Sequence, residues 1–183
     1  MFGTPQTTHS RIAIVGTSGA GKTTLAREVA KRLNLHYIEL DALYWDSDWQ
    51  AAPVEIFRDR VDRALESERW VTDGNYRAVR YIIWSQADTV VFLDYSFGVA
   101  FTRLLRRTLK RAFKREELWN GNQESIRLSF FSTDSVLLWM IRTYSQRRKE
   151  YRQLFQQFEE THLSLVHLRS PAETKAWLLN LSS

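Results

Sequence analysis

The stretch GTSGAGKTT at residues 16–24 matches the phosphate-binding loop pattern G-x-x-x-x-G-K-[ST] at every fixed position, ending in Lys22 and Thr23. An apolar run at residues 12–15 precedes it, and apolar residues at helical spacing follow it as far as residue 33. The local order is therefore strand, glycine-rich loop and helix, the context in which this motif binds phosphate. At an average glycine content of about 7%, the fixed positions match by chance in well under about 1% of chains of this length, which disfavours an accidental turn.

The residue types of this loop suit a phosphate ligand. Glycine allows positive φ and lets the backbone approach a ligand closely. Successive backbone N–H groups at a helix N-terminus bind anions, and the helix dipole adds to the attraction. Lys22 is expected to reach the terminal phosphates, Thr23 to offer its hydroxyl to Mg²⁺, and Thr24 to make a second phosphate contact. The residues expected to contact the nucleotide are Gly16, Ser18, Gly19, Ala20, Gly21, Lys22, Thr23 and Thr24.

The composition of the whole chain excludes several kinds of site. The 183 residues include no cysteine, which excludes disulfides, thiolate metal sites and cysteine nucleophiles, and four scattered histidines argue against a zinc site. No apolar run approaches the roughly 18 residues needed to span a bilayer, and the first ten residues lack the apolar core of a signal peptide. We therefore expect a cytoplasmic protein without membrane contact. The net charge of +5 favours anionic ligands, either nucleotides or nucleic acid.

Strands and helices alternate along the chain. Strands are expected at residues 11–16, 36–40, 70–72, 89–93 and 163–168. Helices are expected after Pro53 and Pro171 and at residues 21–33, 77–84, 97–113 and 132–158. This alternation predicts an α/β fold of three layers with a five-stranded parallel sheet, the P-loop NTPase fold. Residues 1–183 are expected to form a single domain, with an acceptor-side segment near 41–68 and a helical lid near 111–131.

Three aspartates directly follow expected strands. Ligands of such sheets bind outside the carboxyl ends of the strands, so Asp41, Asp73 and Asp94 are expected near the phosphate-binding loop. On the apolar pattern alone Asp94 is the better match for a magnesium-organising aspartate, and the alternative for it is a helix cap before Ser96. Asp41 is the candidate to contact an acceptor hydroxyl and accept its proton, and the alternative for it is a loop-capping role.

Two further features leave alternatives open. Tyr44, Trp45 and Trp49 could stack on the ring of an acceptor or pack in the core. Seven lysines or arginines fall in residues 103–115, and five more fall in residues 142–152. Runs of this kind line phosphoryl-transfer clefts, bind nucleic acid or simply face water.

Three motifs in their order along the chain resemble the adenylate kinase-like nucleoside monophosphate kinases. They are the glycine-rich loop, the segment DGNYR at residues 73–77 and the segment RLLRR at residues 103–107. Those enzymes read D-G-F-P-R in the middle segment, where this chain has Asn75 and Tyr76. The segments DALYWDSDW, WVTDGNYR and RTYSQRRKEY look closer still to a branch known as DNA topology modulation proteins, and this resemblance covers nearly the whole chain.

The resemblance implies ATP as donor with Mg²⁺, and it assigns roles to matching residues. On the acceptor side, Asp73 would organise Mg²⁺ through water, and Arg77 would hold an anion of the acceptor. On the donor side, Arg103 would lie by the base and Arg107 would touch the phosphates. Arginine suits these roles because its planar fork binds phosphate bidentately.

The C-terminal third of the chain carries the remaining implied contacts. Arg147 would stabilise the transferred phosphoryl group, because Tyr151 follows it at the spacing of the family, and Arg142 and Arg148 are neighbours that could share the task. Arg169, after the last strand, would border the adenine of the donor.

The favoured function is therefore a kinase that transfers the γ-phosphoryl group of ATP to a small-molecule acceptor, such as a nucleoside monophosphate. Lys22, Arg107, Arg147 and Asp41 are its candidate catalytic residues, and Asp41, Trp45 and Arg77 its candidate acceptor contacts. The alternative is a nucleotide-binding protein that acts on or with nucleic acid, for which the basic runs are the motive. A third, weaker alternative is a nucleotide-binding protein without transfer activity. The sequence does not name the acceptor.

Overall fold

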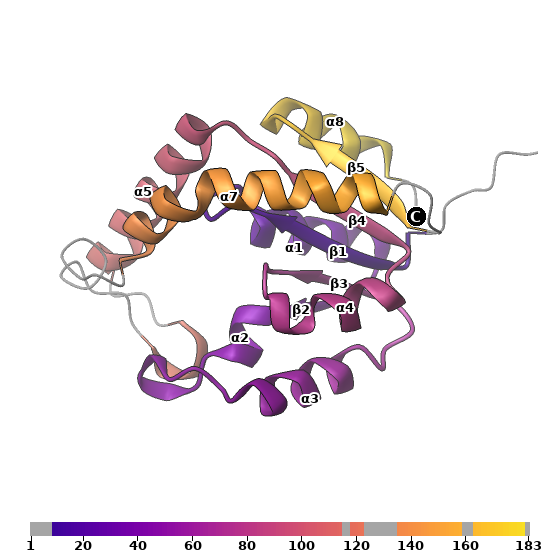
Figure 1. Ribbon diagram of the computed structural model, residues 1–183, viewed down its shortest axis with the longest axis horizontal. Helices are drawn as coiled ribbons and strands as arrows, with labels where there is room; N and C mark the ends of the chain where they lie inside the picture. The colour runs from indigo at the N-terminus through magenta and orange to yellow at the C-terminus, as the bar shows by residue number, and fades with distance from the viewer. Residues whose placement is uncertain (1–8, 115–117, 123–134, 159–162, 182–183) are drawn as a thin grey trace, which may run out of the picture.

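The computed structural model describes residues 9–114, 118–122, 135–158 and 163–181 (Figure 1). Its centre is a sheet of five parallel strands in the order β2-β3-β1-β4-β5. The strands are β1 Arg11–Gly16, β2 His36–Glu39, β3 Trp70–Asp73, β4 Thr89–Leu93 and β5 Ser164–Leu168. All five lie where the sequence predicts them, and the parallel α/β fold is confirmed.

Helices connect the strands and cover the sheet. The α-helices are α1 Lys22–Leu33, α2 Leu40–Tyr44, α3 Val54–Ala64, α4 Arg77–Gln86, α5 Phe97–Lys114, α7 Val136–Gln157 and α8 Pro171–Asn180. Two short 3₁₀ helices, η1 Ser47–Trp49 and η2 Trp119–Gly121, lie in the connections. In the described ranges, no helix combines the length and the apolar character that a bilayer crossing demands.

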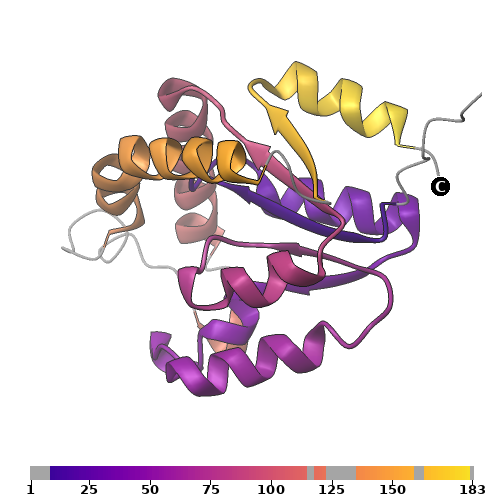
Figure 2. The same ribbon diagram turned by 45° about the vertical axis from the view of Figure 1, so that its right-hand side comes forward.

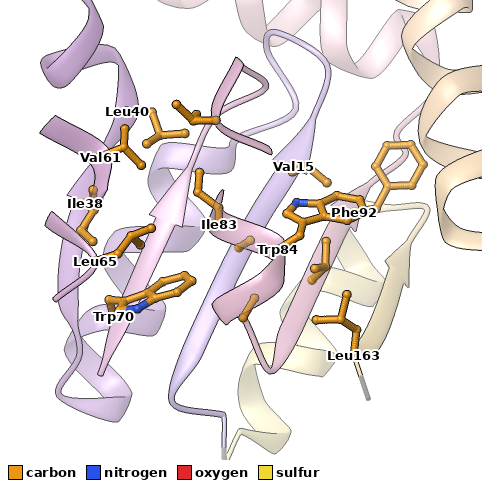
Figure 3. Close-up of a cluster of buried hydrophobic side chains, with 14 of the residues drawn as sticks. Val15, Ile38, Leu40, Val61, Leu65, Trp70, Ile83, Trp84, Phe92 and Leu163 are labelled. Carbon is orange, nitrogen blue, oxygen red and sulfur yellow. The ribbon is translucent and has the colours of Figure 1, made fainter. Parts of the chain in front are cut away.

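The central strand β1 is buried on both faces because helices cover both sides of the sheet, and its alternate side chains point to opposite faces. Ile12 and Ile14 pack with side chains of α1 and α8 on one face. Ala13 and Val15 pack on the other face with side chains of α3, α4 and α7, where Trp84 stands beside Val15 (Figure 3). Helices therefore lie on both sides of the sheet (Figures 1 and 2), which gives the predicted three layers.

The register of the sheet brings four strand ends to one edge. Asp73 is the partner of Ile14 across β1 and β3 and of Glu39 across β3 and β2, and Leu93 is the partner of Gly16 across β1 and β4. The carboxyl end of β1 leads into the glycine-rich loop. Ligand-binding residues on the neighbouring strand ends consequently lie beside that loop.

The structure differs from the sequence prediction after β2. The stretch expected to be an irregular aromatic loop begins with helix α2, so Asp41 lies in the first turn of a helix and not at a strand end. The predicted lid near 111–131 falls mostly outside the described residues. Its described part includes η2, where Asn120 has φ 53°, in agreement with the turn predicted from the sequence WNGN.

Asp94 is a structural anchor, contrary to both of the roles considered for it. Its side chain is 1% exposed and accepts hydrogen bonds from Arg148 and Arg152 of α7, the latter at 2.8 Å, and it pairs with His167 of β5 at 2.9 Å. Burial alone would raise the pKa of Asp94, but the hydrogen bonds from its partners outweigh burial and lower the pKa below its ordinary value. Asp94 thereby joins α7 to the sheet.

Asp94→Asn is expected to lower the free energy of unfolding at pH 7 by about 1–3 kcal/mol, since it removes the charge that two partly exposed arginines face. The depressed pKa means that the wild-type advantage is present above the ordinary aspartate pKa and is lost as the pH falls through the lower folded-state value. Denaturant titrations of both proteins at pH 7 and pH 3 measure this. An equal difference at both pH values would contradict the ionic role.

Candidate active site

The glycine-rich loop packs tightly against neighbouring backbone. A Cβ on Gly19, whose φ is 81°, would lie 2.1 Å from the carbonyl oxygen of Ala100, and a Cβ on Gly16 would lie 2.7 Å from that of Leu93. Gly21 has φ 97° and forms the N-cap of α1. The close approach of β4 and α5 therefore leaves no room for a side chain at Gly16 and Gly19, and the positive φ of Gly21 favours glycine there.

Lys22 turns back onto the loop. Its Nζ donates to the carbonyl oxygens of Gly16 at 3.0 Å and Thr17 at 3.2 Å. The ammonium group is therefore bound to the loop backbone and does not extend into solvent. Burial lowers the pKa of Lys22 to about 8, and the positive charges of Arg107 and Arg147 contribute to the same shift. A bound polyphosphate would favour the charged ammonium again.

Asp73 lies beside Lys22 at the end of β3. Thr23 Oγ1 donates to its Oδ2 at 2.7 Å, and Tyr37 OH donates to its Oδ1 at 2.9 Å. The residue is only 5% exposed. Burial raises the pKa of Asp73 to about 6, although the hydrogen bond from Thr23 and the charge of Lys22 oppose this shift. The two residues predicted for Mg²⁺ are thus in direct contact.

Asp41, in the first turn of α2, lies near the same site. Its negative charge raises the pKa of both Lys22 and Asp73, which places its carboxylate within electrostatic reach of both groups. Tyr76 OH donates to Asp41 Oδ1 at 2.6 Å. The charges of four residues predicted from separate segments therefore act on the Lys22 ammonium, namely Asp41, Asp73, Arg107 and Arg147.

Helix α5 contributes Arg103 to the loop. Its Nη1 donates to the carbonyl oxygen of Ala20 at 3.3 Å, and its guanidinium lies over the ring of Tyr95 at 5.3 Å. Ser18 is half-buried, and Thr24 is exposed in the first turn of α1. The predicted donor contacts are thus grouped around the loop, while a role for Arg103 at the donor base stays a prediction.

Several predicted residues lie away from Lys22 or are held by other partners. The Arg77 side chain is 77% exposed and lies 3.4 Å from Glu150, and the Arg148 side chain binds Asp94. Arg142 is exposed on α7. Arg169 is exposed, and its described hydrogen bond is from its backbone N–H to Glu173.

The aromatic residues of the acceptor-side segment pack against one another. Trp45 meets Tyr44 edge-on at 4.9 Å and Trp49 at 5.7 Å, and Trp49 meets Trp119 of η2 at 6.2 Å. Trp45 and its neighbours remain partly exposed, so both stacking on a ligand and packing stay compatible with their positions.

Asn75 is a site residue that the motif comparison did not assign. Its Oδ1 accepts the backbone N–H of Gly16 at 3.1 Å and the Tyr151 hydroxyl at 3.1 Å, and its Nδ2 donates to the Gly16 carbonyl oxygen. One side chain therefore fixes both backbone groups of the first loop glycine and links them to α7, the helix that carries Arg147. Its position directly after Asp73-Gly74 was the available signal, but the contact to Gly16 depends on the fold.

Several known proteins are similar to parts of this chain. A family model described as the ATPase family associated with various cellular activities (AAA) matches residues 12–94. A cytidylate kinase of Desulforamulus reducens is 43% identical over 56 residues, which are 31% of this chain and 23% of that protein. A shikimate kinase of Parabacteroides distasonis is 42% identical over 60 residues, which are 32% of this chain and 34% of that protein. These matches span only about a quarter to a third of the relatives' lengths.

The similarity of fold extends over the whole chain. The crystal structure of a shikimate kinase from Bacteroides thetaiotaomicron aligns with a TM-score of 0.55 and 18% identity, over 93% of this chain and 94% of that one. The chain therefore has a P-loop fold like that of this kinase. In this kinase-like fold the glycine-rich loop follows β1, and Asp73 ends the neighbouring strand β3.

Asn75→Ala in the kinase-like protein is expected to weaken triphosphate binding by about tenfold or more, because a buried polar contact worth roughly 1–3 kcal/mol no longer fixes Gly16. Titration with a fluorescent ATP analogue measures this. The matched control is Tyr151→Phe, which keeps the ring and removes only the hydroxyl that binds Asn75, and it should weaken binding less. Equal affinity of Asn75→Ala and wild type would show that the loop needs no such support.

Proposed function

We propose that this protein is an ATP-dependent, magnesium-requiring phosphotransferase with a small-molecule acceptor. The observation that carries the proposal is the meeting of opposite charges at Lys22. The negative charges of Asp73 and Asp41 raise the pKa of the Lys22 ammonium, and the positive charges of Arg107 and Arg147 lower it. Phosphoryl transfer requires this combination, since positive groups stabilise the charge on the transferred phosphoryl and carboxylates position the metal and the nucleophile.

The contact between Thr23 and Asp73 supports a magnesium requirement. Mg²⁺ prefers oxygen ligands and is commonly held by one or two protein groups together with substrate phosphates. A hydroxyl and a carboxylate 2.7 Å apart, at the start of the helix that follows the loop, are a suitable pair of donors. The metal would neutralise charge on the phosphates, and Thr23 and Asp73 would hold it directly or through water.

The narrower assignments rest on sequence motifs. Placement near the adenylate kinase-like enzymes is supported by the segments at 73–77 and 103–107, and a cytidylate kinase is among the relatives that match part of the chain. Placement beside the DNA topology modulation proteins is supported only by sequence segments. In the proposed enzyme Arg103, Arg107 and Arg169 contact the donor, and Arg147 contacts the transferred group.

A nucleic-acid function has weaker support. Of the five basic residues at 142–152, Arg148 and Arg152 bind Asp94, and the Arg147 guanidinium lies over the ring of Trp139 at 4.1 Å. Most of this run is therefore engaged within the protein, whereas a surface for nucleic acid presents its cations to phosphates.

The direct test is γ-phosphoryl transfer from labelled ATP, with and without Mg²⁺, to a small-metabolite extract. Lys22→Ala is expected to reduce transfer by at least about 100-fold, because the cation at the phosphates is lost. Thermal unfolding and circular dichroism should show that the variant is folded. Wild-type transfer rates in a folded Lys22→Ala protein would refute the proposed mechanism.

Asp73→Asn should separate stability from function. The folded-state pKa of Asp73, about 6, lies above its ordinary value of 3.8, so the folded protein binds more protons between these pH values and loses stability as the pH rises through this range. We expect the variant to be more stable than the wild type without metal at pH 7, by about 1–3 kcal/mol, and to be inactive with Mg²⁺.

Denaturant titrations between pH 4 and pH 8 measure the stability difference, and Asp62→Asn, which removes an exposed carboxylate of α3, is the control. A variant that is less stable than the wild type at every pH would contradict the burial cost assigned to Asp73.

A further inference from the structure

We propose that the acceptor of this enzyme is an alcohol, so that the product is a phosphate ester rather than a nucleoside diphosphate. The inference rests on the proposed phosphotransferase function and identifies the chemical class of its second substrate. It depends on three features of the acceptor side: the position of Asp41, the way Tyr76 holds it, and the pairing of the nearby arginines.

Asp41 puts a negative charge where the acceptor must react. Leu40 packs against Gly74, directly after Asp73, where a Cβ on the glycine would lie 2.8 Å from Leu40 Cδ1, so the start of α2 lies beside the end of β3. From this position the charge of Asp41 acts on both Lys22 and Asp73, the residues proposed to hold the transferred phosphate and the metal. A nucleoside monophosphate would bring its own anionic phosphate to this position, and like charges at contact distance repel strongly in a partly buried site. An alcohol brings a neutral hydroxyl with a hydrogen to donate, which a carboxylate accepts.

Tyr76 fixes Asp41 in place. Its ring packs against Tyr44 at 4.5 Å and Phe57 at 5.0 Å, and its hydroxyl donates to Asp41 Oδ1 at 2.6 Å. Burial and the charge of Asp41 raise the pKa of Tyr76, so its hydroxyl keeps the proton that it donates. Oδ2 of Asp41, which makes no hydrogen bond in the described parts of the chain, is left for the hydrogen of the acceptor.

Three arginines of α3 and α4 are already paired with carboxylates. Arg60 of α3 binds Asp46 at 2.9 Å. Arg80 of α4 binds Glu150 at 2.9 Å, and Arg77, the residue expected from the family motif to hold an acceptor anion, lies 3.4 Å from the same glutamate. Binding a phosphate here would require breaking these ion pairs, whereas binding a neutral alcohol would not.

The transfer step balances with the groups present. The alcohol oxygen forms a bond to the γ-phosphorus of ATP, the bond from that phosphorus to the β,γ-bridging oxygen breaks, and ADP leaves with the bond's electron pair. The proton of the hydroxyl passes to Asp41 and then to solvent. Lys22, Arg107 and Arg147 offset the charge on the transferred group.

The test identifies the chemistry of the product without knowing the alcohol. Wild-type protein is incubated with γ-labelled ATP and Mg²⁺, in one arm with a protein-free small-metabolite extract treated to remove nucleotides, and in the other with the common nucleoside monophosphates. Labelled product is classed by stability in hot acid, because phosphate monoesters survive and phosphoanhydrides hydrolyse. We expect an acid-stable ester from the extract and no labelled nucleoside diphosphate.

Two variants connect the product to the residues. Asp41→Asn should reduce ester formation by about 100-fold or more while leaving the Kd for ATP within about twofold, since general-base effects are of the order of 10²–10⁴. Tyr76→Phe keeps the ring packing and should lower kcat by about tenfold with an unchanged KM for ATP. Asp62→Asn, which removes an exposed carboxylate of α3, is the matched control and should behave as wild type.

The outcomes separate the two proposals. Labelled nucleoside diphosphate would overturn the alcohol acceptor and leave the phosphotransferase function standing. ADP and inorganic phosphate as the only products would also overturn the alcohol acceptor. If ATP is consumed in neither of the two arms, the phosphotransferase function itself is overturned, and the inference with it. A fully active Asp41→Asn protein would remove Asp41 from the mechanism.

Discussion

The Lys22 ammonium is a partly buried charge that the surrounding structure must compensate. Removing such a group from water costs several kcal/mol unless hydrogen bonds and opposite charges replace the hydration. The carbonyl oxygens of Gly16 and Thr17 supply the hydrogen bonds, and Asp73 and Asp41 supply the charge. Arg107 and Arg147 oppose this compensation, which holds the pKa of Lys22 near 8. The site therefore gains from an anionic ligand, and a polyphosphate matches that need.

The groups around Lys22 are held by a rigid frame that extends well beyond the loop. Gly19 lets the loop touch the backbone of α5, and Asn75 connects Gly16 to Tyr151 of α7. Asp94 then fastens α7 to the sheet through two arginines. Because α7 also carries Arg147, these contacts determine where that guanidinium lies relative to Lys22. Preorganised charge of this kind costs little rearrangement when a reaction begins.

The same frame carries groups that oppose its stability. Asp73 is buried with a pKa near 6, so keeping it ionised at neutral pH costs free energy that a metal or a nucleotide complex would return. Asp94 is equally buried, but its pKa is lowered because Arg148, Arg152 and His167 of the protein itself bind its carboxylate. Asp94 is therefore a carboxylate that stabilises the fold, whereas ionised Asp73 lowers stability in exchange for a role in binding.

The sequence alone determined the order of strands and helices along the chain and the position of the glycine-rich loop, because these depend on local patterns. It also indicated that Asp73 would lie beside Lys22 and Thr23, because the carboxyl ends of parallel strands share one edge of the sheet. It did not determine that Asp94 would bind α7 or that α2 would carry Asp41, since an apolar strand followed by aspartate looks the same in both cases. The motif pattern also offered Arg77 as an acceptor contact, and only the packing of α4 against α7 placed it beside Glu150. Which charges neutralise one another depends on contacts between residues far apart in the sequence, such as Arg80 and Glu150, which are 70 positions apart, and only the tertiary structure decides these.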